Sequence, residues 1–117
     1  MLDRVIIDQL IEDIGQDVFL RLAVQFLEET ADRLASITAC RDKAQWRELA
    51  RHAHSLKSTW QSFGLQLTGR LAQALQIAGD QENLSAIDQL IPELIETVAV
   101  ECREFDAMRE AMALSLR

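Results

Sequence analysis

A chain of 117 residues is long enough for one hydrophobic core, so we expect a single domain over residues 1–117. Hydrophobic residues make up 49% of it and only 4 Gly and 1 Pro interrupt it, which excludes a disordered chain and a many-stranded β fold. The 12 basic and 19 acidic residues give a net charge of −7, which disfavours nucleic acid and anionic membranes as partners. The composition predicts an all-α protein.

The sequence also indicates a soluble, cytoplasmic protein. Asp3 and Arg4 interrupt the apolar residues at the N-terminus, unlike in a signal peptide. No apolar run approaches the roughly 20 residues that cross a bilayer. Cys40 and Cys102 lie far apart; pairing stays open, but two reduced, packed thiols are the simpler interpretation. The start at Met1 and the compact length favour a free-standing protein.

Apolar residues recur at helical spacing from the N-terminus onward. A first short helix is expected to stop at Gly15. Asp17 then caps a long second helix, whose apolar face reaches Ile37. A third helix is expected over about 42–63 and ends at Gly64.

The second half of the chain continues this pattern. A fourth helix is expected to break at Gly79 and Asp80, and a fifth to span about 84–116. Pro92 falls inside the fifth and either kinks it or divides it. Four main helices with short connections predict an antiparallel four-helix bundle, with the short N-terminal helix covering one end.

The third helix has two contrasting faces. An apolar face, expected in the core, contains Trp46, Leu49, Ala53, Leu56, Trp60 and Phe63. A stripe roughly opposite contains Lys43, Arg47, Ala50, Arg51, His54, Lys57, Ser58 and Gln61. Residues 41–79 hold six basic and two acidic residues, so this segment is +4 and the remainder −11. Such a stripe is also what a merely solvated helix face looks like.

The histidine at the centre of the stripe indicates more than solvation. We expect His54 to be exposed, with Lys57 and Ser58 one turn later and Ala50 and Arg51 one turn earlier. Small neighbours leave room for a bulky group at the imidazole, and a lysine can neutralise phosphoryl oxygens. Imidazole is a nucleophile near neutral pH. These features suit accepting and returning a phosphoryl group.

The second histidine serves as a comparison. His52 is rotated by about 200° from His54 around the helix, and we expect it to be partly buried and structural, beside Leu56 and Phe63. Residues at i and i+2 do not face each other, so the two histidines make a poor metal site. No HExxH motif occurs, and no metal site is expected.

The run from Ala53 to Gly64 resembles the AHxLKGxxxxFG motif of histidine-containing phosphotransfer (HPt) domains. The matching positions are Ala53, His54, Leu56, Lys57, Phe63 and Gly64. Most members have Gly where this chain has Ser58. Ser is small and can hydrogen-bond a phosphate, and monomeric quorum-sensing phosphorelay members from vibrios also carry Ser there. The order of the expected helices fits the family along the whole chain.

This resemblance implies a phosphocarrier that is phosphorylated on Nε2 of His54 with support from Lys57. A glutamine 22 residues after the histidine hydrogen-bonds the imidazole or phosphate in several members, and Gln76 has that spacing. The candidate phosphate- or partner-binding residues are Ser58, Gln61, Gln76, Arg47, Arg51 and Gly64. The implied partners are receiver domains of a sensor kinase and a response regulator, which supply Mg²⁺, so the carrier needs no cofactor and is expected to be a monomer.

Two alternatives stay open beside the carrier. A helical adaptor would bind partners without being phosphorylated, and the Ala53–Lys57 run argues against it. An enzyme or metalloprotein with a site in the bundle core is disfavoured, because no Glu-x-x-His motif is present. No Walker A run or glycine-rich ATP loop occurs either, so we expect no autokinase activity.

Overall fold

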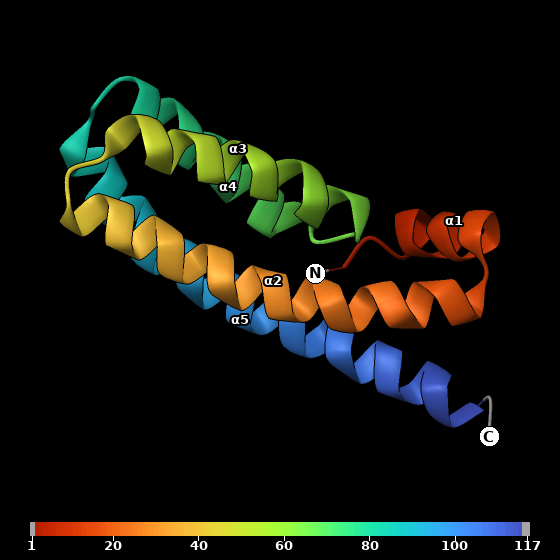
Figure 1. The fold of residues 1–117 in the computed structure, drawn as a ribbon. Helices are drawn as coiled ribbons and strands as arrows, with labels where there is room; N and C mark the ends of the chain where they lie inside the picture. The colour runs from red at the N-terminus through yellow and green to blue at the C-terminus, as the bar shows by residue number, and fades with distance from the viewer. Residues whose placement is uncertain (1, 116–117) are drawn as a thin grey trace.

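The computed structural model describes residues 2–115, and within them the chain forms five helices joined by short turns (Figure 1). Their bounds are α1 Arg4–Ile14, α2 Gln16–Asp42, α3 Trp46–Ser62, α4 Gln66–Asp80 and α5 Leu84–Ser115. In this described part the sole β pairing is an isolated bridge between Leu2 and Leu65. The predicted all-α class is confirmed.

The helices form a bundle of one long and one short pair. α2 and α5 have 27 and 32 residues, whereas α3 and α4 have 17 and 15. The short pair therefore leaves one end of the long pair uncovered, and α1 lies there, beside the N-terminal part of α2 (Figure 1). Ile7 of α1 is fully buried at this end. The predicted four-helix bundle with an N-terminal helix over one end is confirmed.

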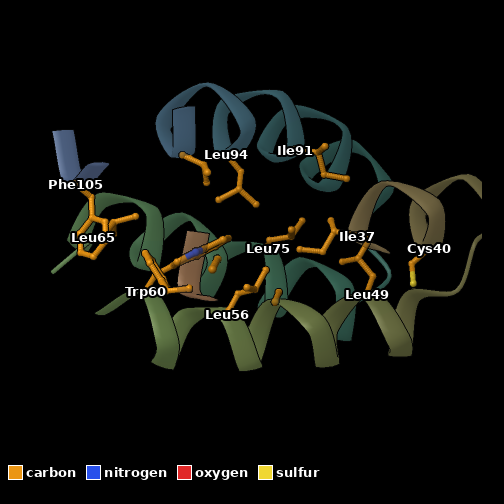
Figure 2. Packing of buried hydrophobic residues seen from close by; sticks show 14 of the residues in the cluster. Ile37, Cys40, Leu49, Leu56, Trp60, Leu65, Leu75, Ile91, Leu94 and Phe105 are labelled. Carbon is orange, nitrogen blue, oxygen red and sulfur yellow. The ribbon is translucent and has the colours of Figure 1, made fainter. Parts of the chain in front are cut away.

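The core runs along the inside of α2, α3, α4 and α5, and Figure 2 shows Trp60 of α3 packed within it. Trp60 is fully buried, and its indole Nε1 donates a hydrogen bond to Oγ1 of the buried Thr30 at 3.0 Å. Of the predicted apolar face of the third helix, Trp46 and Phe63 are only half-buried. The remaining four residues are buried, so this face is core, as predicted.

Several predicted boundaries are wrong by a few residues. α2 begins directly after Gly15, so Asp17 lies in its first turn instead of capping it. α3 begins at Trp46, not near 42, because α2 extends to Asp42 and a turn follows. Lys43 is therefore the C-cap of α2 and does not lie on α3. The sequence pattern missed this because residues 43–45 carry no Gly or Pro.

The α5 helix continues through Pro92, so the proline does not divide it. Pro92 is exposed, and its missing N–H leaves the Asp88 carbonyl without its usual helical donor. The Asp88 carboxylate accepts a hydrogen bond from Nε of Arg41 at 2.8 Å, which ties α5 to the end of α2. A proline on the solvent side of a helix with tertiary support is tolerated.

Both cysteines are free thiols, in agreement with the reduced pair expected from the sequence. Cys40 is buried in the core. Cys102 is half-buried, and burial, followed by the nearby Glu101 and Asp106 carboxylates, raises the pKa of its thiol to about 11. This thiol is therefore neutral, and a poor nucleophile, at physiological pH.

A buried carboxylate caps the start of α4 from another helix. Glu101 of α5 is fully buried and accepts hydrogen bonds from the backbone N–H of Thr68, at 2.7 Å, and from its hydroxyl. The first N–H groups of a helix lack partners within the helix. No side chain at the N-cap, Leu65, supplies one, so α5 satisfies an end of α4 that the local sequence leaves open.

The α2, α3 and α4 helices end in the same hydrogen-bonded turn. After α2, the N–H of Ala44 donates to the Arg41 carbonyl and that of Gln45 to Cys40, which is a Schellman motif. Gly64 occupies the left-handed position of this motif after α3, with φ of 85°. Ala44 holds the same position after α2 with φ of 55°, where a side chain is disfavoured.

We expect Ala44→Gly to stabilise the protein by about 0.5–1 kcal/mol. Relief of left-handed strain, about 1–2 kcal/mol, outweighs the greater backbone entropy that glycine loses on folding. Urea unfolding followed by circular dichroism measures the difference. Ala39→Gly, the same change at an exposed position inside α2, is the control and is expected to cost about 1 kcal/mol. Equal signs for the two variants would contradict the strain at Ala44.

Candidate functional site

His54 lies exposed on α3, on the side that faces α4. Its Nδ1 lies 3.2 Å from Oε1 of Gln76 on α4. The contact joins residues 22 positions apart, as the resemblance to phosphotransfer domains implies. The imidazole is thus held from the neighbouring helix while its other nitrogen remains on the solvent side.

Close packing of α3 and α4 brings these two side chains together. A Cβ added at Gly79 of α4 would lie 3.1 Å from Cβ of Ala50 and 3.2 Å from Cδ2 of Leu49. The helices therefore approach closely one turn from His54. Gly79 is buried within α4, one residue before this helix ends at Asp80, so the predicted end of the fourth helix is confirmed. Ala50 is buried as well, and it does not belong to the exposed stripe.

A shallow pocket of about 380 Å³ opens beside the imidazole. Its lining residues come from α3 and α4: Arg47, Ala50, Arg51, His54, Gln76 and Asp80. We refer to this as the His54 pocket. A phosphoryl group or the edge of a partner protein has access to the ring there, and two arginines lie on the wall that precedes the histidine in α3.

The hydrogen bond that Gln76 accepts fixes the tautomer of the neutral His54 ring. An amide oxygen only accepts, so Nδ1 of the ring must carry the proton that it donates to Oε1. In the neutral ring Nε2 then holds a lone pair. A lone pair is therefore available on Nε2 of the neutral ring, and the contact with Gln76 orients the ring.

His52 lies on the other side of α3 and is half-buried, as predicted. Its Nδ1 is 3.2 Å from Nη1 of Arg33 on α2. Guanidinium groups only donate, so in this contact the His52 nitrogen is the acceptor. His52 thus contributes to the α2–α3 interface. The helical pattern of α3 could not identify Arg33 as the partner of His52, because Arg33 lies on another helix.

Lys57 and Ser58 follow His54 by one turn. Lys57 is half-buried and Ser58 is exposed, and within residues 2–115 neither side chain forms a hydrogen bond or an ion pair. Both polar ends are therefore free to bind a group placed on Nε2. Neither residue is among those that line the His54 pocket, and their roles in binding phosphate remain predictions.

Gln61 and Gly64 lie outside the His54 pocket. The Gln61 side chain packs over Gly69, where an added Cβ would lie 2.5 Å from its Cγ. Gly64 is buried at the end of α3, where an added Cβ would lie 2.8 Å from Cγ1 of Ile7 and 2.9 Å from the Asp3 carbonyl oxygen. The absence of a side chain at Gly64 therefore allows α1 to pack against the end of α3. Because Gly64 is buried there, it is not accessible to phosphate or to a partner.

The basic stripe is divided by the structure. Arg47 and Arg51 both line the His54 pocket. Arg51 is paired with Glu48 at 3.0 Å, one turn away, whereas Arg47 forms no ion pair within the described residues. Lys43, in the turn before α3, is not among the lining residues. Arg47 is thus the cation most available to a partner at this site.

The sequence pattern missed Asp80 as a member of the site. Asp80 is the last residue of α4, where the sequence predicts the end of that helix, and it also lines the pocket. It follows Gln76 by four residues, so both lie on one face of α4. With Gln76 placed opposite His54, this spacing of four residues is the sequence feature that could have identified Asp80 as part of the site.

Residues 2–115 contain no group of three His, Cys, Asp or Glu side chains placed to hold a metal ion. Among the same residues, no helix is long and apolar enough to cross a membrane.

A helical bundle with one exposed histidine, held by an amide and flanked by cations, has the form of a histidine phosphotransfer domain. The family model of the Hpt domain matches residues 21–112, so the chain belongs to the Hpt domain family. It is a histidine phosphotransfer protein of phosphorelays, and proteins of this family are phosphocarriers rather than enzymes.

The fold is similar to that of a solved member. The crystal structure of histidine-containing phosphotransfer protein B (HptB) from Pseudomonas aeruginosa PAO1 aligns with a TM-score of 0.89 at 23% identity. The alignment covers 94% of this chain and 95% of HptB. No match is found among curated protein sequences.

Proposed function

We propose that His54 is the phosphorylated residue and that it relays a phosphoryl group from the receiver domain of a sensor kinase to that of a response regulator. The observation that carries the proposal is the hydrogen bond between Nδ1 of His54 and Oε1 of Gln76 in an open pocket. In the neutral ring it places the proton on Nδ1 and leaves a lone pair on Nε2, which is what a nucleophile toward phosphorus requires.

The lone pair of His54 Nε2 attacks the phosphorus of the receiver's aspartyl phosphate in line. An N–P bond forms, the O–P bond breaks, and the aspartate leaves as a carboxylate, so no proton has to move. The ring, still protonated on Nδ1, becomes cationic, and the Gln76 oxygen stabilises that charge. The reverse sequence on a second receiver returns the phosphoryl group.

Charge around the phosphoryl group is neutralised from both proteins. Lys57 lies one turn beyond His54 with its ammonium unpaired, and Arg47 lies on the pocket wall. The receiver contributes its own Mg²⁺, and the carrier needs no cofactor. The carrier acts as a cytoplasmic monomer, and the whole chain is one domain.

Transfer from receivers tests this proposal. Candidate receiver domains are phosphorylated with acetyl phosphate and mixed with the protein, and acid-labile, alkali-stable label is followed over time. Label on the chain from at least one receiver supports the proposal. Stable binding of receivers with no label from any of them would contradict it and would favour the adaptor instead.

We expect Lys57→Ala to slow transfer about tenfold and to shorten the lifetime of the phosphohistidine, because one charge-assisted contact to the phosphoryl group is lost. Stability should change by only about 0.5 kcal/mol, since the side chain forms no ion pair or hydrogen bond in the described structure. Arg21→Ala removes the same charge from an exposed site on α2 and should transfer normally. Equal rates and half-lives in the two variants would remove Lys57 from the site.

A further inference from the structure

Asp80 is an acidic side chain on the wall of an otherwise basic pocket. We propose that Asp80 selects the receiver: it binds a cationic side chain of the incoming receiver domain, while Arg47 on the facing wall binds an acidic one. This inference rests on the proposed transfer at His54, and it names the charge pattern that the partner must present.

The two charges are exposed, close to one pocket and not neutralised by each other. Arg47 and Asp80 both line the His54 pocket, and both line an adjoining cavity with Gly79 and Glu82. Within residues 2–115, no ion pair of 4.0 Å or less involves either of them. Arg51, by contrast, is held by Glu48 at 3.0 Å. Arg47 and Asp80 are therefore the pair of opposite charges that remains available to a partner.

Folding does not account for an aspartate at this position. Asp80 is the last residue of α4, where the negative end of the helix dipole favours a cation. The Asp80 carboxylate forms no hydrogen bond or ion pair in the described structure that would offset this. A residue that opposes the local helix preference next to a nucleophile is expected to serve binding.

The geometry places the selected contact beside the transfer site. Asp80 follows Gln76 by about one helical turn, a rise of about 6 Å along α4, and both residues line the His54 pocket. A docking surface that is acidic throughout would be attracted by Arg47 and repelled by Asp80. A receiver with both signs at matching positions is attracted by both. Asp80 thus acts on docking and is a specificity residue, while bond formation at Nε2 stays as described.

The test uses the full chain and a receiver domain that transfers label to the wild type after charging with acetyl phosphate. We expect Asp80→Lys to lower kcat/KM for this transfer about tenfold while raising the Tm by about 2 °C, because a cation now lies at the end of α4. Asp80→Glu should retain transfer. Glu96→Lys, the same charge change at an exposed site on α5, should transfer as the wild type does. Phosphoramidate, which reaches His54 without docking, should label all four proteins equally.

The opposite changes in transfer and in Tm separate partner selection from a structural role. Transfer by Asp80→Lys at the wild-type rate or faster would overturn the inference, and so would an equal loss in Glu96→Lys. Restoration of Asp80→Lys transfer by a Lys→Glu or Arg→Glu change on the receiver would establish the pairing. Failure of both phosphoramidate and every receiver to label the wild type would overturn the proposed function itself, an outcome distinct from the failure of Asp80 alone.

Discussion

Replacement of His54 by glutamine is expected to abolish phosphorylation of the chain while leaving the fold intact. Glutamine has no nucleophilic nitrogen, and the imidazole is the one group at this site that can form the N–P bond. The His54 side chain is exposed and forms a hydrogen bond with Gln76. The free energy of unfolding should therefore change by only about 0.5 kcal/mol. Label transferred from a charged receiver, with unfolding in urea as the check on folding, measures both effects.

The matched control is His52→Gln, two residues away on the same helix. This change removes the contact with Arg33 at the α2–α3 interface but leaves the His54 pocket unchanged. Transfer should remain near the wild-type level. If wild type and His54→Gln accept label equally, or if His52→Gln is the variant that loses it, the assignment of the phosphorylated residue is wrong.

The largest loss of stability is expected for Trp60→Ala, at about 3–5 kcal/mol. The indole is fully buried within the core (Figure 2), and its removal leaves both a cavity and a Thr30 hydroxyl without its partner. Domains of this size have a total stability of about 5–15 kcal/mol. The variant should therefore be close to unfolded at 37 °C, and circular dichroism during urea unfolding measures the change.

Two further variants separate packing from hydrogen bonding at this position. Trp46→Ala removes an indole that is only half-buried at the start of α3, and it should cost less than half as much. Trp60→Phe with Thr30→Val forms a double-mutant cycle that isolates the hydrogen bond, expected at about 1 kcal/mol. A loss below about 1 kcal/mol in Trp60→Ala would show that the core does not depend on this side chain.

The fold class and the central residue of the site could be predicted from the sequence alone. Both depend on local information: apolar spacing specifies amphipathic helices, and the motif around His54 fixes which side chains lie one turn apart on α3. The contact of His54 with Gln76, between two helices, was implied by the family resemblance and not by the helical pattern. Composition and motif were sufficient because neither depends on the exact helix ends.

Only the tertiary structure decided the surroundings of that histidine. The close approach of α4 at Gly79 buries Ala50 and brings Asp80 into the pocket, and an isolated helical pattern contains no information on how near the next helix lies. Gly64 belongs to the docking of α1, not to the pocket, because its neighbours Ile7 and Asp3 come from the other end of the sequence.

Helix ends and buried polar contacts were likewise beyond the sequence. The start of α4 is capped by Glu101 from α5, so no local capping residue marks it. α2 ends at a left-handed Ala44, where a glycine would have indicated the turn. The sequence by itself thus determined a helical bundle that exposes His54, because those properties follow from neighbours along one helix. The shape and charge of the pocket follow from contacts between helices, which form only when the bundle packs.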